Sequence, residues 1–121
     1  MSRIPSIILG AAALALTLTG CAGAAASPVD VSDEAIIIDV RTAQEYAAGH
    51  LDGAENLDVT SGELAAALAT LEQDAEYLVY CRSGNRSAQA VRLMQDAGFT
   101  DVTDLGSLDQ AAQSTQLPVV G

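Results

Sequence analysis

The chain has 121 residues and a formal net charge of −11, because sixteen Asp and Glu residues face five cations, all of them arginine. This balance argues against a nucleic-acid-binding protein, since neutralising phosphates takes a cluster of basic side chains, and against a basic patch for an anionic membrane surface. The length allows one domain, and the hydrophobic fraction of 50% indicates a packed core.

The first twenty residues have the features of a secretory signal peptide. Arg3 precedes an apolar run at residues 7–18, which as a helix would rise about 18 Å, too little for a hydrocarbon core of about 30 Å. The sequence Leu-Thr-Gly-Cys at 18–21 resembles a bacterial lipobox. That resemblance implies removal of residues 1–20 and a lipid on Cys21, whereas the alternative is a plain signal peptide with a chance cysteine. We therefore expect an extracytoplasmic protein that is lipid-anchored to a bacterial cell membrane, either inner or outer.

Residues 21–30 are mostly small and show no helical or strand periodicity, which predicts a lipidated flexible tether before a domain at 31–121. Two acyl chains supply the anchor that stable membrane binding needs. If Cys21 carries lipid, Cys81 is the only thiol left, so no internal disulfide is possible.

The domain then alternates predicted strands and helices. The apolar run at 35–40 is typical of a strand buried on both faces of a parallel sheet. Thr42 and Glu45 have the spacing of a capping box and open a short helix that ends at Gly49. A short strand is expected at 56–59.

The same order continues in the second half of the chain. Thr60 and Glu63 again have capping-box spacing, before the apolar stripe of an amphipathic helix at 64–71. Residues 77–80 (YLVY) predict a further strand, because β-branched and aromatic residues dominate it.

The last elements follow the segment CRSGNRS. A helix is expected from near Ser87 to a Schellman turn at 98–99, then a strand at 101–105 and a shorter helix before Leu117. Alternating strands and helices imply right-handed βαβ crossovers. We therefore predict an α/β fold with a doubly wound parallel sheet of about five strands and helices on both faces.

Cys81 directly follows the strand at 77–80, at the carboxyl edge where parallel α/β sheets place ligands. Residues 82–86 must turn back within five positions, and Gly84 relieves the backbone there. Such a loop can direct successive N–H groups inward as an anion-binding nest, with the positive end of the next helix behind it. These N–H groups and the two arginines of the loop would favour the nucleophilic thiolate. The alternative is a buried structural cysteine before an ordinary turn.

Taken together, the motifs resemble those of single-domain rhodaneses, which are sulfurtransferases of the thiosulfate type. The matching segments are Asp39-Val40-Arg41, Glu45-Tyr46, Gly49-His50-Leu51, Gly53-Ala54, Asn56 and Cys81-Arg82-Ser83-Gly84-Asn85-Arg86-Ser87. The resemblance implies that Cys81 accepts a sulfane sulfur from a donor such as thiosulfate, forms a persulfide, and passes the sulfur to cyanide or a thiol. The loop at 82–87 would bind the donor through backbone N–H groups and arginines. We assign no metal ligand and no cofactor to the chain.

Four further residues are expected to support the site rather than to react. Asp39, Arg41 and Glu45 are interpreted as one structural hydrogen-bonded or ionic set near the site, because ion-pair networks are often structural. The resemblance implies that His50 fixes a loop.

The chain also departs from the family at both ends. The family usually ends its last strand with Gly-Gly and has a Trp about four residues on. Here Gly106-Ser107 and Ala111 stand in those places, and the usual opening strand and helix are reduced to residues 29–34. These changes predict thinner packing at the two ends and leave the loop after Cys81 intact.

Two other functions use the same fold. One is a persulfide carrier or interaction module of the cell envelope, with a protein as sulfur acceptor. The other is a phosphatase or arsenate reductase, but in those relatives the loop between cysteine and arginine is one residue longer and fits a tetrahedral phosphate. Arg86 follows Cys81 by five positions, and Tyr80 stands where a His would precede the cysteine.

Overall fold

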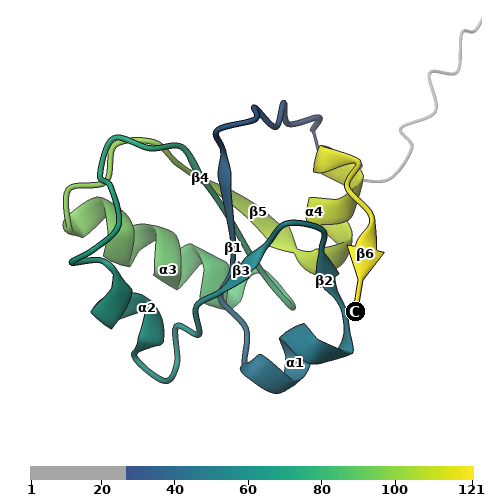
Figure 1. Cartoon of the computed structure of the whole chain (residues 1–121), viewed down its shortest axis with the longest axis horizontal. Coiled ribbons are helices and arrows are strands. Elements are labelled where there is room, and N and C mark those ends of the chain that lie inside the picture. The colour runs from purple at the N-terminus through teal and green to yellow at the C-terminus, as the bar shows by residue number, and fades with distance from the viewer. Residues whose placement is uncertain (1–26) are drawn as a thin grey trace, which may run out of the picture.

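The computed structural model describes residues 27–121, so the predicted signal peptide and Cys21 lie outside the described residues. In chain order the elements are β1 (Ile36–Asp39), α1 (Ala43–Ala48), β2 (His50–Leu51), β3 (Glu55–Asn56), α2 (Glu63–Ala67), β4 (Tyr77–Cys81), α3 (Asn85–Asp96), β5 (Val102–Ser107), α4 (Leu108–Thr115) and β6 (Val119–Val120). Their arrangement is drawn in Figure 1.

The main sheet is parallel throughout, in the order β3-β1-β4-β5. The strand of highest predicted β-propensity, β4, lies inside the sheet between β1 and β5, and all five of its residues are buried. The α/β class is thus confirmed. The parallel sheet of the described chain has four strands rather than about five, because residues 27–35 form no strand.

Helices cover both faces of this sheet (Figure 1). On one face, Leu64 of α2 and Met94 of α3 pack with Val79 of β4. On the other, Ala111 of α4 packs with Leu78, and Tyr46 of α1 lies against the same cluster. Adjacent residues of β4 therefore pack into hydrophobic cores on opposite faces of the sheet. Because both faces are covered, the strand sequence is continuously apolar instead of alternating between apolar and polar residues.

Helix ends agree with the sequence at several places. The predicted capping box at Thr42 and Glu45 is present, and Gly49 ends α1. The Schellman turn is confirmed as well, since the N–H of Phe99 bonds to the carbonyl of Met94 and the N–H of Gly98 to that of Gln95.

The capping box predicted at Thr60 is wrong. Its hydroxyl and its N–H both donate to Oδ1 of Asp58, at 2.7 and 2.8 Å. Thr60 is therefore part of a turn and does not cap the helix. The N-cap of α2 is Gly62, in the left-handed region at φ 86°. The helix ends at Ala67, earlier than the predicted 71, although Leu71 still packs against the core.

The two ends of the domain meet beside α4. The N–H of Val29 donates to the carbonyl of Ser114 at 2.8 Å, so part of the expected tether is hydrogen-bonded to the domain. After α4 the chain adds an element that the sequence did not predict, β6, which pairs antiparallel with β2 through His50↔Val120 and Leu51↔Val119.

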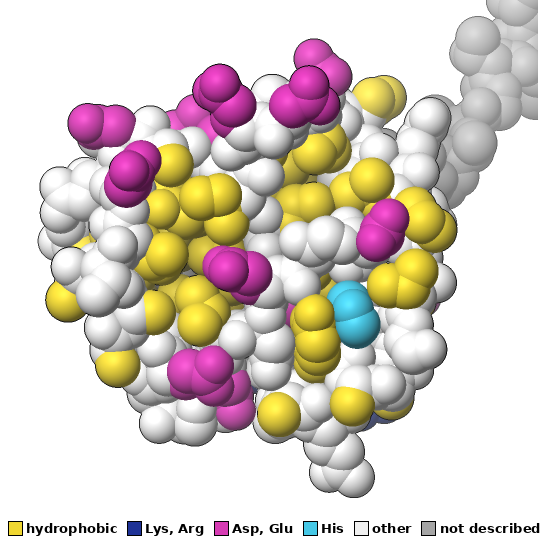
Figure 2. All heavy atoms as spheres, viewed as in Figure 1, with side chains coloured by type: hydrophobic (Ala, Val, Ile, Leu, Met, Phe, Trp, Pro, Cys, Tyr) yellow, Lys and Arg dark blue, Asp and Glu magenta, His cyan; other side chains and the backbone are white. Residues whose placement is uncertain are grey.

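Among the charged side chains on the face seen in Figure 2, nearly all are acidic, and they lie between groups of exposed hydrophobic side chains. Among residues 27–121, no helix is both long enough and apolar enough to span a membrane.

Candidate active site

Cys81 is the last residue of β4 and is completely buried at the carboxyl edge of the sheet. The N–H of Gly84 donates to its Sγ at 2.8 Å, which makes the short loop a cradle for sulfur. The thiol also lies 3.4 Å from Oγ of Ser87, whose own hydroxyl donates to the carbonyl of Gly84 at 3.0 Å. The loop and the first turn of α3 thus surround one atom.

Gly84 makes this geometry possible. It has φ 96° and ψ −16°, in the left-handed region that favours glycine, and it is the N-cap of α3. Because the chain reverses there, α3 begins at Asn85, two residues before the predicted start near Ser87. The positive end of the helix is therefore closer to Sγ than the sequence suggested.

These contacts act on the pKa of Cys81 in opposite directions. Burial raises it, but the hydrogen bond between the thiol and the Ser87 side chain, together with those from the N–H groups of Ser87, Gly84 and Ser83, outweighs burial and holds the pKa of Cys81 below its ordinary value. The thiolate is the nucleophilic form of cysteine. The contacts around Cys81 therefore favour its thiolate form.

Arg86 turns toward α1 and is held by Glu45. Its Nη1 and Nη2 donate to Oε1 and Oε2 of Glu45 at 2.7 and 2.9 Å, a bidentate ion pair. This pair lowers the pKa of Glu45 to about 2. Binding of a donor by the Arg86 side chain stays a prediction, and in this structure the guanidinium is engaged with Glu45.

Asp39 and Arg41 form a second and separate ion pair. Nη2 of Arg41 lies 2.6 Å from Oδ2 of Asp39 and also donates to the carbonyl of Gly49, while the Tyr80 hydroxyl donates to Oδ2 at 2.7 Å. Tyr80 in turn accepts from the N–H of Leu51. Asp39, Arg41, Leu51 and Tyr80 are buried, and their polar groups are paired, as buried polar groups must be to avoid a desolvation cost.

The structure therefore divides the expected set of Asp39, Arg41 and Glu45. The first two belong to a buried network under the loop at 49–51, and Glu45 belongs to the reactive loop through Arg86. His50 stacks on Tyr46 with ring centroids 3.7 Å apart, and its Nδ1 lies 2.8 Å from the Tyr46 carbonyl. These contacts join β2 to α1 and fit a loop-fixing residue.

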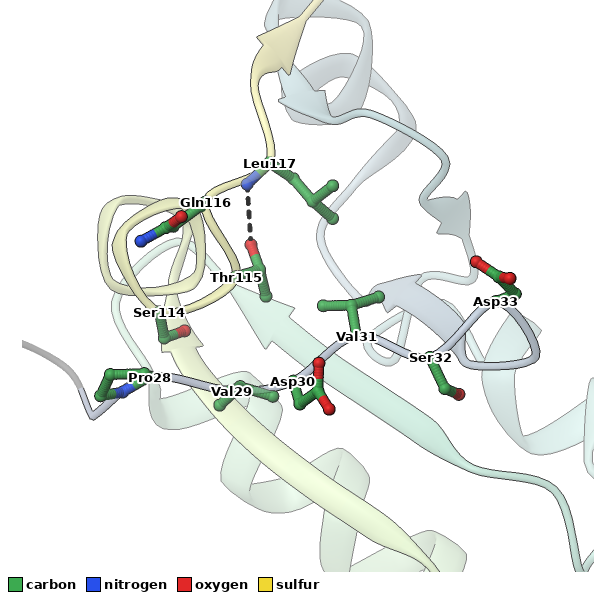
Figure 3. A pocket seen from close by; sticks show the side chains of 10 residues that line it. All are labelled: Pro28, Val29, Asp30, Val31, Ser32, Asp33, Ser114, Thr115, Gln116 and Leu117. Carbon is green, nitrogen blue, oxygen red and sulfur yellow. Dashed lines mark hydrogen bonds between the residues drawn. The ribbon is translucent and has the colours of Figure 1, made fainter.

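Arg82, Ser83 and Asn85 are exposed around the cradle. Arg82 lines a pocket of about 440 Å³ beside α4, together with Arg41, Glu45, Ala48, Leu108 and Asp109. A different pocket, of about 660 Å³, lies between residues 28–33 and the end of α4 at 114–117 (Figure 3). The two pockets are at opposite ends of α4, and only the first adjoins the reactive loop.

Two residues near the site are not among those predicted from the sequence. The hydroxyl of Tyr80 bridges the N–H of Leu51 and the carboxylate of Asp39. Asp58, which follows β3, is buried, and burial raises the pKa of its carboxyl. The hydrogen bonds from Thr60, together with the charge of Arg86, outweigh burial, so the pKa of Asp58 lies below its ordinary value. The sequence contained one usable signal, because Asp-x-Thr is the pattern of an Asx turn.

The fold and this site define a class of protein: a parallel α/β domain with a buried cysteine at the carboxyl edge of the sheet, contacted there by the amides of a short loop. The family model described as "Rhodanese-like domain" matches residues 25–111. The chain belongs to the rhodanese-like domain family.

Proteins described as sulfurtransferases are similar to this chain in sequence. The chain is 41% identical over 68 residues to the thiosulfate sulfurtransferase GlpE of Pseudomonas putida, covering 56% of this chain and 60% of that protein. It is 38% identical over 80 residues to the probable adenylyltransferase/sulfurtransferase MoeZ of Mycobacterium tuberculosis, covering 64% of this chain but 20% of that much longer protein. The putative sulfurtransferase YtwF of Bacillus subtilis is 31% identical over 66% of this chain and 76% of its own length.

Solved structures have the same fold. A rhodanese with anions from E. coli superimposes with a TM-score of 0.60 at 30% identity, covering 71% of this chain and 96% of that one. The human single-domain sulfurtransferase TSTD1 superimposes with a TM-score of 0.60 at 28% identity, covering 71% and 95%.

Proposed function

We propose that this protein is a sulfurtransferase that moves a sulfane sulfur from thiosulfate or a similar anionic donor through a persulfide on Cys81 to cyanide or a thiol. We further propose that it works outside the cytoplasm, held at the cell membrane by a lipid on Cys21. The observation that carries the catalytic part is the short contact between the Gly84 N–H and Sγ of Cys81, 2.8 Å, at a loop whose hydrogen bonds favour the thiolate. Relatives described as sulfurtransferases support the same reaction.

In the loading half-reaction, the Cys81 thiolate attacks the outer sulfur of thiosulfate. A sulfur–sulfur bond forms to Sγ, the original sulfur–sulfur bond breaks, and sulfite leaves with its electron pair, so no external oxidant or reductant is needed. The persulfide carries one negative charge. The loop N–H groups that favour the thiolate can also stabilise this charge, since preorganised amide donors act wherever charge develops.

In the second half-reaction, cyanide or a thiolate attacks the terminal sulfur of the persulfide. The bond to Sγ breaks and its electron pair returns to Cys81, which restores the starting thiolate. This two-step covalent scheme predicts ping-pong kinetics.

The short loop supports sulfur transfer over phosphate chemistry. Only Arg82, Ser83 and Gly84 separate Cys81 from α3, and Arg86 is already paired with Glu45. In the phosphatase and arsenate reductase relatives, a loop one residue longer fits a tetrahedral phosphate. We therefore expect neither phosphatase nor arsenate reductase activity.

Intact-mass spectrometry tests the catalytic proposal. Wild-type protein exposed to thiosulfate should gain the mass of one sulfur atom, and Cys81→Ala should gain none and form no thiocyanate from cyanide. Wild-type protein that forms no adduct would overturn the proposal. Adduct formation without turnover on cyanide or small thiols, with rapid transfer to a co-purified protein, would instead support the carrier function.

The anchor has its own test. Protein extracted from its native membrane should carry a diacyl mass on the peptide that begins at Cys21, and Cys21→Ala should lose that mass and leave the membrane fraction. An unmodified cysteine in the extracted protein would exclude the lipid anchor.

A further inference from the structure

A pocket of about 440 Å³ lies beside the reactive loop. Its volume falls within the range of small-molecule sites. The pocket is lined by Arg41, Glu45, Ala48, Arg82, Leu108 and Asp109.

The strand register places this pocket beside the reactive loop. Cys81 of β4 and Ser107 of β5 are paired in the parallel register, so the residues that follow them leave the same edge of the sheet side by side. Arg82 follows Cys81, and Leu108 and Asp109 follow Ser107. One lining residue thus comes from the reactive loop itself, and two come from the first turn of α4.

Two of the four charged side chains that line the pocket are neutralised by ion pairs within the protein. Arg41 is neutralised by Asp39, and Glu45 is neutralised by Arg86. Arg82 and Asp109 are both exposed, and within residues 27–121 neither takes part in an ion pair. One positive and one negative charge are therefore left to act on whatever enters.

We propose that this pocket binds the sulfur acceptor, and that the acceptor is a small thiol carrying both a carboxylate and an ammonium group, that is, a thiol of the amino-acid type. Arg82 pairs with its carboxylate, Asp109 with its ammonium group, and the Leu108 side chain contacts its methylene carbon. This inference rests on the proposed function and adds to it the chemical class of acceptor.

The reaction in the pocket is balanced without a further reagent. The acceptor thiolate attacks the terminal sulfur of the Cys81 persulfide, a new sulfur–sulfur bond forms on the acceptor, and the electron pair of the broken bond returns to Sγ. The products are the acceptor persulfide and the Cys81 thiolate.

The test measures single-turnover sulfur transfer from purified Cys81-persulfide protein to four thiols: free cysteine with both charges, cysteamine with the ammonium group only, 3-mercaptopropionate with the carboxylate only, and uncharged 2-mercaptoethanol. For each thiol, the rate of a variant is divided by the wild-type rate, so that the intrinsic nucleophilicity of the thiol cancels. The variants are Arg82→Gln and Asp109→Asn. Asp101→Asn, an exposed carboxylate just before β5, is the matched control.

Single exposed charge pairs are modest, so we expect losses of about threefold. Asp109→Asn should slow free cysteine and cysteamine by this factor and leave the two thiols without an ammonium group unchanged or slightly faster. Arg82→Gln should slow free cysteine and 3-mercaptopropionate and spare the other two. Asp101→Asn should change none of the four.

Equal losses for all four thiols, no loss, or a selective loss in only one of the two variants would overturn the inference. Its failure can be told apart from failure of the proposed function, because the latter appears earlier, when thiosulfate does not load Cys81. In that case inorganic polysulfide supplies the persulfide, and the acceptor preference is still measured.

Discussion

Glu45 and Arg86 join α1 to the first turn of α3 through two hydrogen bonds of 2.7 and 2.9 Å. These residues are 41 positions apart in the sequence, and one of them lies in the reactive loop. The pair thus links the reactive loop to α1.

We expect Glu45→Gln to lower the free energy of unfolding by about 1 kcal/mol at neutral pH, because the pair is only half-buried. The pKa of Glu45 is lowered to about 2 in the folded protein from an ordinary value of 4.5. A carboxylate with a lowered pKa stabilises the fold fully above its unfolded pKa and loses this contribution as the pH falls through the folded one. In urea unfolding, the difference between wild type and variant should therefore be full at pH 6 and shrink between about pH 4.5 and 2. A difference that stays constant over this range would contradict the assignment.

Ser87→Ala should raise the pH at which the alkylation rate of Cys81 reaches half of its maximum. The variant removes the side-chain hydrogen bond that lowers the thiol pKa most strongly and leaves burial, which raises it. The rate of reaction with iodoacetamide as a function of pH measures this midpoint. Ser83→Ala is the control, because Ser83 is exposed and contributes through its backbone N–H. An equal shift in both variants would argue against the role of the Ser87 hydroxyl.

Gly84→Ala should damage both stability and reactivity. A Cβ at this position would meet nothing closer than 3.9 Å, so the cost arises from the backbone at φ 96° rather than from a clash. A left-handed conformation costs an L-residue about 1–2 kcal/mol, and a loop that relaxes from it moves its N–H away from Sγ.

Gly62→Ala separates the two effects. Gly62 has φ 86° with open space around it, but it caps α2, away from Cys81. Both variants should lose similar stability in urea unfolding, and only Gly84→Ala should slow persulfide formation with thiosulfate, by about tenfold or more if the sulfur loses one amide donor. Equal rates in the two variants would mean that the Gly84 N–H is dispensable.

Tyr80→Phe tests the buried network. The variant leaves the Leu51 N–H without its acceptor and removes one donor from Asp39, which should cost about 1–3 kcal/mol in unfolding free energy. Because this network does not contact Sγ, the alkylation midpoint of Cys81 should stay at the wild-type pH. A shifted midpoint would show that the network also tunes the thiol.

Local sequence predicted those features that neighbouring residues decide. The strand at 77–80, the capping box of Thr42 and the Schellman turn at 98–99 each depend on side chains and backbone within a few positions. Cys81 at the end of a buried strand is a feature of the same kind. The capping box at Thr60 failed for an equally local reason, since Asp58 competes for the same hydroxyl and N–H.

Tertiary structure alone decided that Glu45 pairs with Arg86. Asp39 and Arg41 lie two positions apart and are expected together from the sequence, whereas nothing in the spacing of Glu45 and Arg86 indicates that they pair. Pairing across 41 positions depends on how α1 and α3 pack on the sheet. By itself, the sequence determined an acidic α/β domain with a cysteine in a short loop of glycine and arginines. Folding determined that two arginines near Cys81 are neutralised and that Arg82 remains exposed beside it, because ion pairs form between side chains that packing brings together.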